Sequence, residues 1–91
     1  MALKPAATTA LNKANEVGAQ IDLSGYFNLS LSGSWAGTVK LERSFDNGST
    51  WLIVDSFTAN IETTGYEPEG ATYRLRCSAY TSGVITGRLG Q

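Results

Sequence analysis

The side chains with the best spacing for chemistry lie in the middle of the chain, over residues 44–51. Asp46 is flanked there by hydroxyl groups, and four further acids follow it: Asp55, Glu62, Glu67 and Glu69. Two carboxylates on either side of a sugar can hydrolyse a glycosidic bond, so a glycosidase is one interpretation. In Asp46-Asn47-Gly48, however, the Asp side chain accepts hydrogen bonds from following N–H groups and Gly supplies a positive φ. We therefore expect Asp46 to stabilise a tight turn, and we expect no catalytic residues.

The same stretch has the pattern Ser44-x-Asp46-x-Gly48-x-Thr50-Trp51. This pattern resembles the Asp box, a hairpin of sialidase-type propellers and of several unrelated β-proteins. The resemblance implies that Asp46 accepts hydrogen bonds from turn amides and that Trp51 anchors the hairpin in the core. A propeller sialidase also needs several blades and an arginine cluster, which 91 residues cannot provide. We therefore expect a structural hairpin in a protein that is not an enzyme.

Other reactive groups are scarce. The chain has no histidine, the commonest general base and metal ligand, so we expect no metal site and no cofactor. Cys77 is the single cysteine, which excludes an internal disulfide. It alternates with Tyr73 and Leu75, and this spacing predicts a buried core residue rather than a reactive thiol.

Four arginines fall in expected strands: Arg43, Arg74, Arg76 and Arg88. On one sheet face they could form a basic stripe for nucleic acid. They could also pair with nearby acids, or contribute to a subunit interface, where arginine is enriched. The net charge of −1 favours ion pairs and predicts no nucleic-acid partner.

Four aromatic residues occur at strand ends or in loops: Tyr26, Trp35, Tyr66 and Tyr80. Such residues can close the ends of a small sandwich, anchor a protein interface or form a platform for carbohydrate. Tyr66 is expected to be the most exposed, because it lies in an acidic loop. The candidate interface residues are Lys4, Lys13, Trp35, Tyr66, Arg74, Arg76 and Tyr80.

From residue 19 onward, apolar and polar residues alternate in short runs separated by glycine-rich turns. Phe27, Leu29 and Leu31 share one face in this way, as in a half-buried strand. We expect about seven strands, over residues 20–23, 26–32, 37–42, 51–58, 60–64, 71–78 and 84–89, with a break at the acidic loop 65–70. The pattern predicts an all-β fold, a small antiparallel sandwich of immunoglobulin-like (Greek-key) or jelly-roll-like type.

Residues 1–18 differ from the remainder of the chain. They are rich in Ala, Thr, Asn and Lys and show neither strand alternation nor an apolar helical stripe. We expect an N-terminal arm here that orders on a neighbouring subunit, followed by a β-sandwich domain over residues 19–91. No apolar run approaches the roughly 18 residues of a membrane span, and the first residues lack a signal-peptide pattern. We therefore expect no membrane partner and synthesis in a reducing cytoplasm.

A longer pattern is formed by five stretches, residues 31–51, 66–70, 73–77, 80–83 and 87–91. Over about residues 25–91, this pattern resembles small virion proteins of tailed bacteriophages. The resemblance implies a structural protein made in the host cytoplasm and located on the capsid surface, most plausibly as a head decoration (cement) protein. Its partners would be the major capsid protein and other copies of itself, as a dimer or trimer. A head-to-tail or tail component, or a carbohydrate- or host-surface-binding module, is the alternative.

Overall fold

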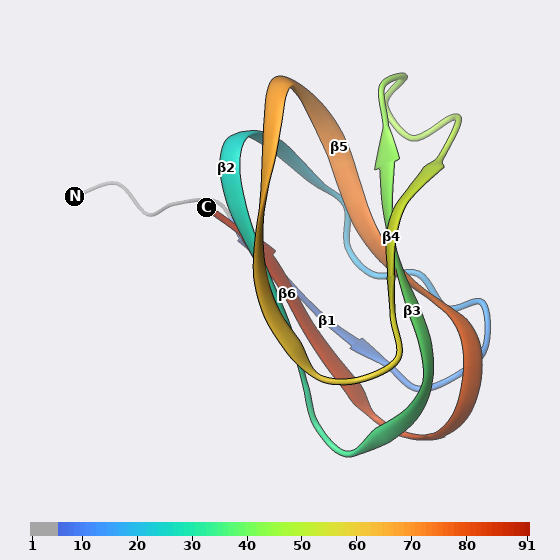
Figure 1. Ribbon diagram of the computed structural model, residues 1–91. Coiled ribbons are helices and arrows are strands. Elements are labelled where there is room, and N and C mark those ends of the chain that lie inside the picture. The colour runs from blue at the N-terminus through green and yellow to red at the C-terminus, as the bar shows by residue number, and fades with distance from the viewer. Residues whose placement is uncertain (1–5) are drawn as a thin grey trace.

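The computed structural model describes residues 6–91, and every regular element in this range is a β-strand. The strands are β1 (Ala6–Leu11), β2 (Ile21–Ser32), β3 (Trp35–Ser44), β4 (Leu52–Phe57), β5 (Ile61–Gly83) and β6 (Ile85–Gly90). They form one antiparallel sheet in the order β1-β6-β2-β5-β3-β4 (Figure 1). The predicted all-β class is confirmed. The predicted sandwich is not, because the six strands form one continuous, open sheet.

The long strand β5 joins the two halves of the sheet. Its first part pairs with β2 and its second part pairs with β3. Between these parts the register shifts: Leu23 pairs with Ala71 but Gly25 pairs with Glu67, which leaves residues 68–70 as a bulge. Gly25 and Gly70 have φ values of +81° and +88°, which favour glycine. β2 and β5 arch together here, at the top of Figure 1.

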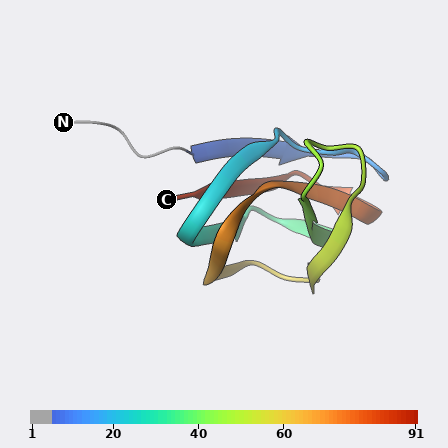
Figure 2. The same ribbon diagram turned by 90° about the horizontal axis from the view of Figure 1, so that it is seen from above.

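The curvature of the sheet creates the core on its concave side. Leu75 of β5 lies against Gly87 of β6, although these strands are not neighbours in the sheet. Figure 2 shows how the strands curve around this space. The buried apolar residues are Leu11, Leu23, Phe27, Leu29, Leu31, Val39, Leu41, Phe57, Tyr73, Leu75, Cys77, Ile85 and Leu89. The alternation predicted for residues 26–32 and 71–78 therefore places the expected side chains in the core.

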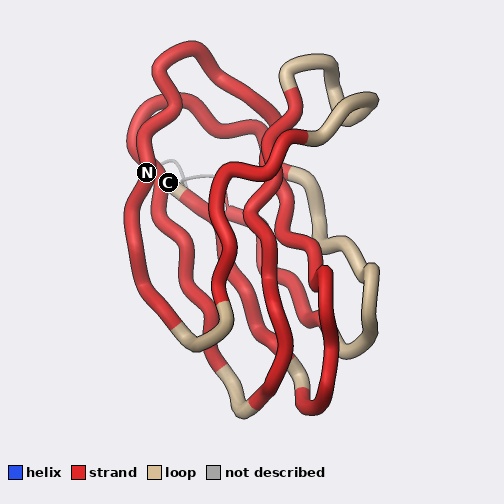
Figure 3. Tube along the Cα trace, turned by 45° about the vertical axis from the view of Figure 1, so that its right-hand side comes forward, coloured by secondary structure: helices blue, strands red, loops and turns tan. Residues whose placement is uncertain are grey.

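Six strands form instead of the expected seven, because two predicted breaks do not interrupt pairing and β1 adds a strand that was not expected. Residues 21–23 and 26–32 belong to the single strand β2, which bends at Gly25. Residues 61–64 and 71–78 belong to β5, and of the acidic loop between them residues 65–67 pair with β2 while residues 68–70 form the bulge. Pro68 is tolerated because the bulge requires no N–H from it for the ladder. Loops are confined to the ends of the strands (Figure 3).

The separate N-terminal arm is not confirmed. Ala6–Leu11 form the edge strand β1, which pairs with β6, and the Leu11 side chain is fully buried. Residues 15–18 then run along the second part of β5: the Asn15 and Gly18 N–H groups donate to the carbonyls of Cys77 and Leu75 at 2.7 Å. These contacts satisfy backbone groups of β5 on the side that β3 leaves free. Residues 1–5, including Lys4, lie outside the described range.

Candidate functional site

The Asp-box residues form a hydrogen-bonded turn between β3 and β4. The Ser44 hydroxyl donates to Asp46 Oδ1 at 2.7 Å and accepts the Gly48 N–H at 2.8 Å. The Thr50 N–H donates to the same Asp46 oxygen at 2.8 Å. The bond from Ser44, followed by that from Thr50, lowers the pKa of Asp46 to about 2. The carboxylate is therefore ionised at neutral pH and engaged in the turn, an arrangement suited to holding two strands and not to donating a proton.

Trp51 does not enter the core, which corrects the role that the Asp-box resemblance implied. Its ring lies 4.0 Å from the guanidinium carbon of Arg74, and its Nε1–H donates to the Gly48 carbonyl at 3.0 Å. The indole is half-buried on the side of the β3–β5 pair that carries Arg74. Trp51 lies just before the first residue of β4. Its ring packs on the guanidinium group of Arg74, a cation–π contact.

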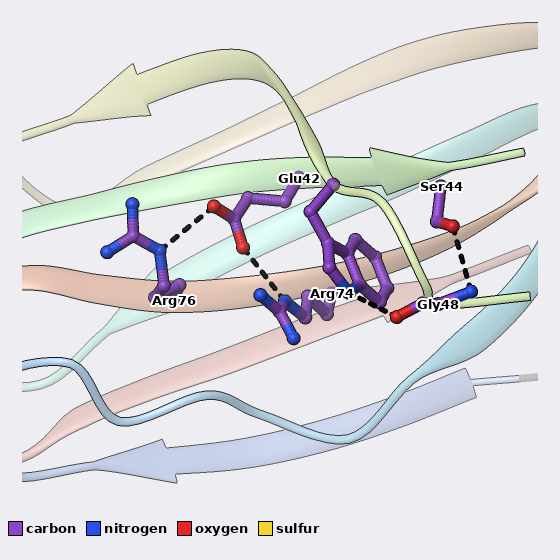
Figure 4. A network of polar contacts seen from close by, with 6 residues as sticks. Glu42, Ser44, Gly48, Arg74 and Arg76 are labelled. Atoms are coloured by element: carbon purple, nitrogen blue, oxygen red, sulfur yellow. Dashed lines mark hydrogen bonds and ion pairs between the residues drawn. The ribbon is translucent and has the colours of Figure 1, made fainter. Parts of the chain in front are cut away.

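Glu42 links two predicted interface arginines on the outer face of the sheet. Its two carboxylate oxygens accept from Nε of Arg74 at 2.8 Å and from Nε of Arg76 at 2.9 Å (Figure 4). Burial raises the pKa of Glu42, but the hydrogen bonds from Arg74 and Arg76 outweigh it and leave the pKa below its usual value. Arg74 and Arg76 therefore form ion pairs with an acidic residue, which is the arrangement that the net charge favoured over a basic stripe for nucleic acid.

A second ion pair lies at the edge of the core, below the arch. Glu67 is buried, and its Oε1 accepts from the Tyr73 hydroxyl at 2.8 Å and from Arg43 at 3.2 Å. Burial raises the pKa of Glu67, and the bonds from Tyr73, the Glu69 N–H and Arg43 lower it more. The Nε atom of Arg43 is also buried, and it has no hydrogen-bond partner. Arg43 is thus the one cation of the described residues that retains a buried, unused donor.

The remaining predicted residues have structural contacts. Trp35 donates from Nε1 to Asn60 Oδ1 at 2.7 Å, and the Tyr80 hydroxyl donates to the Gly83 carbonyl at 2.7 Å. Both rings are half-buried and pack against the core. Cys77 is fully buried, and burial raises the pKa of its thiol, so it is a core residue. Lys13 lies exposed in the loop after β1.

A polar groove of about 350 Å³ runs beside the Asp-box turn. Its lining includes one acidic side chain, Asp22, which accepts a hydrogen bond from the Thr72 hydroxyl at 2.7 Å. Glycoside hydrolysis uses a pair of carboxyl groups across the scissile bond. Asp46 points into its own turn, so the groove does not provide such a pair. No cluster of three potential metal ligands occurs within residues 6–91.

Two strongly exposed aromatic residues, Tyr26 and Tyr66, lie on the arch. They lie directly opposite each other on β2 and β5, with ring centroids 4.7 Å apart. These residues are 77% and 57% exposed although the two rings are in contact, and an exposed apolar cluster of this kind is informative. Both tyrosines stand out in the sequence, but the expectation that Tyr66 is the most exposed of the four aromatic residues is wrong, because Tyr26 is more exposed. Their contact was not predicted, because it depends on the register of two strands far apart in the chain.

A second exposed apolar surface lies on the edge strand β4. Leu52, Ile53 and Val54 are 50%, 57% and 42% exposed. The sequence pattern of these residues is that of a buried strand, so their exposure was not predicted. The three consecutive apolar residues were the available signal, because an edge strand with such residues is a common contact site.

Comparison with known proteins yields no relative of this chain. No family model matches it, and no curated protein and no solved structure is significantly similar. The described residues contain no helix that is long and apolar enough to cross a membrane.

Proposed function

We propose that the protein is a non-enzymatic structural protein of a tailed-bacteriophage virion, which binds the head shell as a decoration (cement) protein. The observation that carries this proposal is the exposed pair Tyr26 and Tyr66 on the arch. Clustered tyrosines are frequent binding hot spots, because they bury large areas at low entropic cost. The resemblance over residues 25–91 supports a virion component, and the major capsid protein is the proposed partner.

The structure below the arch supports this role by keeping the tyrosines in place. Next to them in the core, the rings of Phe27 and Tyr73 pack at a tilt with centroids 4.8 Å apart, and the Tyr73 hydroxyl donates to Glu67. A rigid contact residue loses little freedom on binding, so more of the contact free energy contributes to affinity. Many copies on one shell would then make a modest affinity per copy sufficient.

The test uses purified protein and mature, expanded heads of the phage that encodes it. The wild-type protein should co-sediment with heads in stoichiometric copy number and protect them against heat or chelators. The double variant Tyr26→Ala/Tyr66→Ala should lose at least about tenfold in affinity. Val84→Ala is the matched control, because Val84 is an exposed apolar residue away from the arch. Failure of the wild-type protein to co-sediment would contradict the proposal.

The carbohydrate-binding alternative uses the same exposed rings, because tyrosine rings also stack on sugars. In that case a glycan array should give a signal that disappears in Tyr66→Ala. Trp35→Ala should leave this signal intact, because the Trp35 indole N–H is already bonded to Asn60. A glycan signal together with absent head binding would favour this alternative over the decoration role.

A further inference from the structure

Two free strand edges border the same hollow on the open side of the sheet. Within residues 6–91, β4 pairs with β3 alone, and residues 61–67 of β5 pair with β2 alone. A hollow of about 190 Å³ lies between them, with Val54, Asp55 and Phe57 on one side and residues 63–66 on the other. Figure 1 shows the course of β4 and of the first half of β5, and we call the hollow that their residues line the β4–β5 slot.

The backbone at the sides of the slot determines what shape can fill it. Each edge presents N–H and C=O groups at strand spacing, and only another extended chain can pair with a row of such groups. One end of the slot is held by Asn60 in the loop between β4 and β5. This residue accepts from Trp35 and donates from Nδ2 to the Gly33 carbonyl at 2.8 Å. The slot is therefore preformed, which lowers the cost of binding a strand.

The floor of the slot is apolar. It is lined by side chains of the core: Phe27, Leu29, Leu41, Phe57 and Tyr73. Alternate side chains of an entering strand would point toward this floor, and the others would point to solvent. The exposed residues Leu52, Ile53 and Val54 extend the apolar surface along β4. The strand that fits has apolar residues at every second position.

Arg43 gives the slot a charge preference. Arg43 lines the hollow, and its Nη1 donates to Glu67. Its buried Nε–H has no acceptor. A carboxylate is the acceptor that an arginine N–H binds most strongly. Asp55 lies exposed on the side of the same hollow and disfavours a second negative charge. One acid in the entering strand, near Arg43, therefore fits best.

We infer that the β4–β5 slot is an acceptor site for one extended segment of a partner protein, with alternating apolar residues and a single carboxylate directed to Arg43. The segment adds a strand to the open side of the sheet. This site borders the arch and shares Tyr66 with the tyrosine pair, but it is lined mainly by other residues and does not depend on the decoration role. The decoration role and the slot have separate experiments, so a negative result for one does not contradict the other.

The test uses a synthetic peptide of about nine residues, alternating Val and Thr with one central Glu and a Lys at each end. One control peptide has Gln in place of Glu, and another has Pro at a central position. Amide chemical shifts and hydrogen exchange of the full-length protein report where each peptide binds. We expect the Glu peptide to bind below about 1 mM and to protect amides of β4 and of residues 61–67. The Gln peptide should bind about tenfold more weakly, and the Pro peptide should not bind.

Three protein variants, one of them a control, make the assignment specific. Val54→Asp places a negative charge at the side of the slot and should abolish binding of the Glu peptide. Val84→Asp makes the same change at an exposed residue beyond β5 and should have no effect. Arg43→Gln should bind the Glu and Gln peptides with equal affinity. The circular dichroism spectrum of this variant checks that its β-sheet is retained. No binding, binding at the β1 edge, or equal affinity of the two peptides for the wild-type protein would overturn the inference.

Discussion

Three acidic side chains are kept ionised by contacts that the fold provides. Glu42 and Glu67 accept hydrogen bonds from arginines, and Asp46 accepts them from its own turn. All three have a lowered pKa. A group whose pKa falls on folding stabilises the folded state above its unfolded pKa, and this contribution is lost as the pH falls through the folded value. For Asp46 the window extends from 3.8 down to about 2.

Acidification should therefore destabilise the protein in this window. The urea midpoint should fall between about pH 4 and pH 2, and Asp46→Asn should show a smaller fall, because Asn keeps an acceptor but does not titrate. The measurement is the urea midpoint at a series of pH values. Asp55→Asn, which removes an exposed carboxylate from β4, is the matched control. An identical pH dependence of Asp46→Asn and the wild-type protein would show that the turn bonds do not need the ionised form.

Trp51 provides a second test at the residue level. Trp51→Ala should lower the free energy of unfolding by about 1–2 kcal/mol, because it removes one cation–π contact and one hydrogen bond from a half-buried site. Urea denaturation measures this change directly. Trp51→Phe should recover part of the loss, since a ring over Arg74 is retained. A loss of about 3–5 kcal/mol would instead be that of a core aromatic residue.

Among the elements, the arch of β2 and β5 has the largest influence on the molecule. It lets the 23-residue strand β5 pair with β2 through its first part and with β3 through its second part. It also places Tyr26 and Tyr66 at an outer surface and leaves the first half of β5 with a free edge. Its bend depends on glycines with positive φ, so backbone conformation at a few positions controls both candidate surfaces.

Gly70→Ala and Gly83→Ala separate backbone strain from collision. Both glycines have nearly the same φ, +88° and +86°. A Cβ at Gly70 would have its nearest neighbour, Ser24 Cβ, at 3.5 Å, so this variant should lose about 1–2 kcal/mol from strain alone. A Cβ at Gly83 would collide with the backbone carbonyl of Ser34, so this variant should be several kcal/mol less stable or fail to fold. Equal melting temperatures would contradict the collision.

Sequence alternation predicted the elements whose large side chains have a two-residue period. Phe27, Leu29 and Leu31 are buried together for this reason. β1 was not predicted, because Ala6–Leu11 contains mainly Ala and Thr and its position depends on pairing with β6 at the other end of the chain. The bulge at residues 68–70 reads locally as a loop, since Pro and Gly break strands except where a bulge accommodates them. Neither candidate surface follows from local pattern, because each depends on which strands lie at an edge or in the arch.

For the whole molecule, the N-terminal segment of residues 6–18 contributes a side chain to the core. Leu11 is fully buried, and residues 15–18 cover the second part of β5. We expect Leu11→Ala to lower the free energy of unfolding by about 2–5 kcal/mol, as truncation of a core leucine does. Thermal and urea unfolding measure this loss. Lys13→Ala, in the exposed loop that follows, should change stability by less than about 0.5 kcal/mol. A loss below about 1 kcal/mol for Leu11→Ala would make the segment peripheral to the core.

The pairing of β1 with β6 has a mechanical consequence. Ala6 lies opposite Gly90, so the first and last strands of the chain are antiparallel neighbours at one edge of the sheet. Tension applied between the two ends of the chain would load their backbone hydrogen bonds one after another, beginning at this pair. Strands pulled lengthwise past each other would instead share the load over all of their bonds at once. The domain should therefore open like a zipper from its edge at low force, while a force that enters through the arch meets the whole sheet.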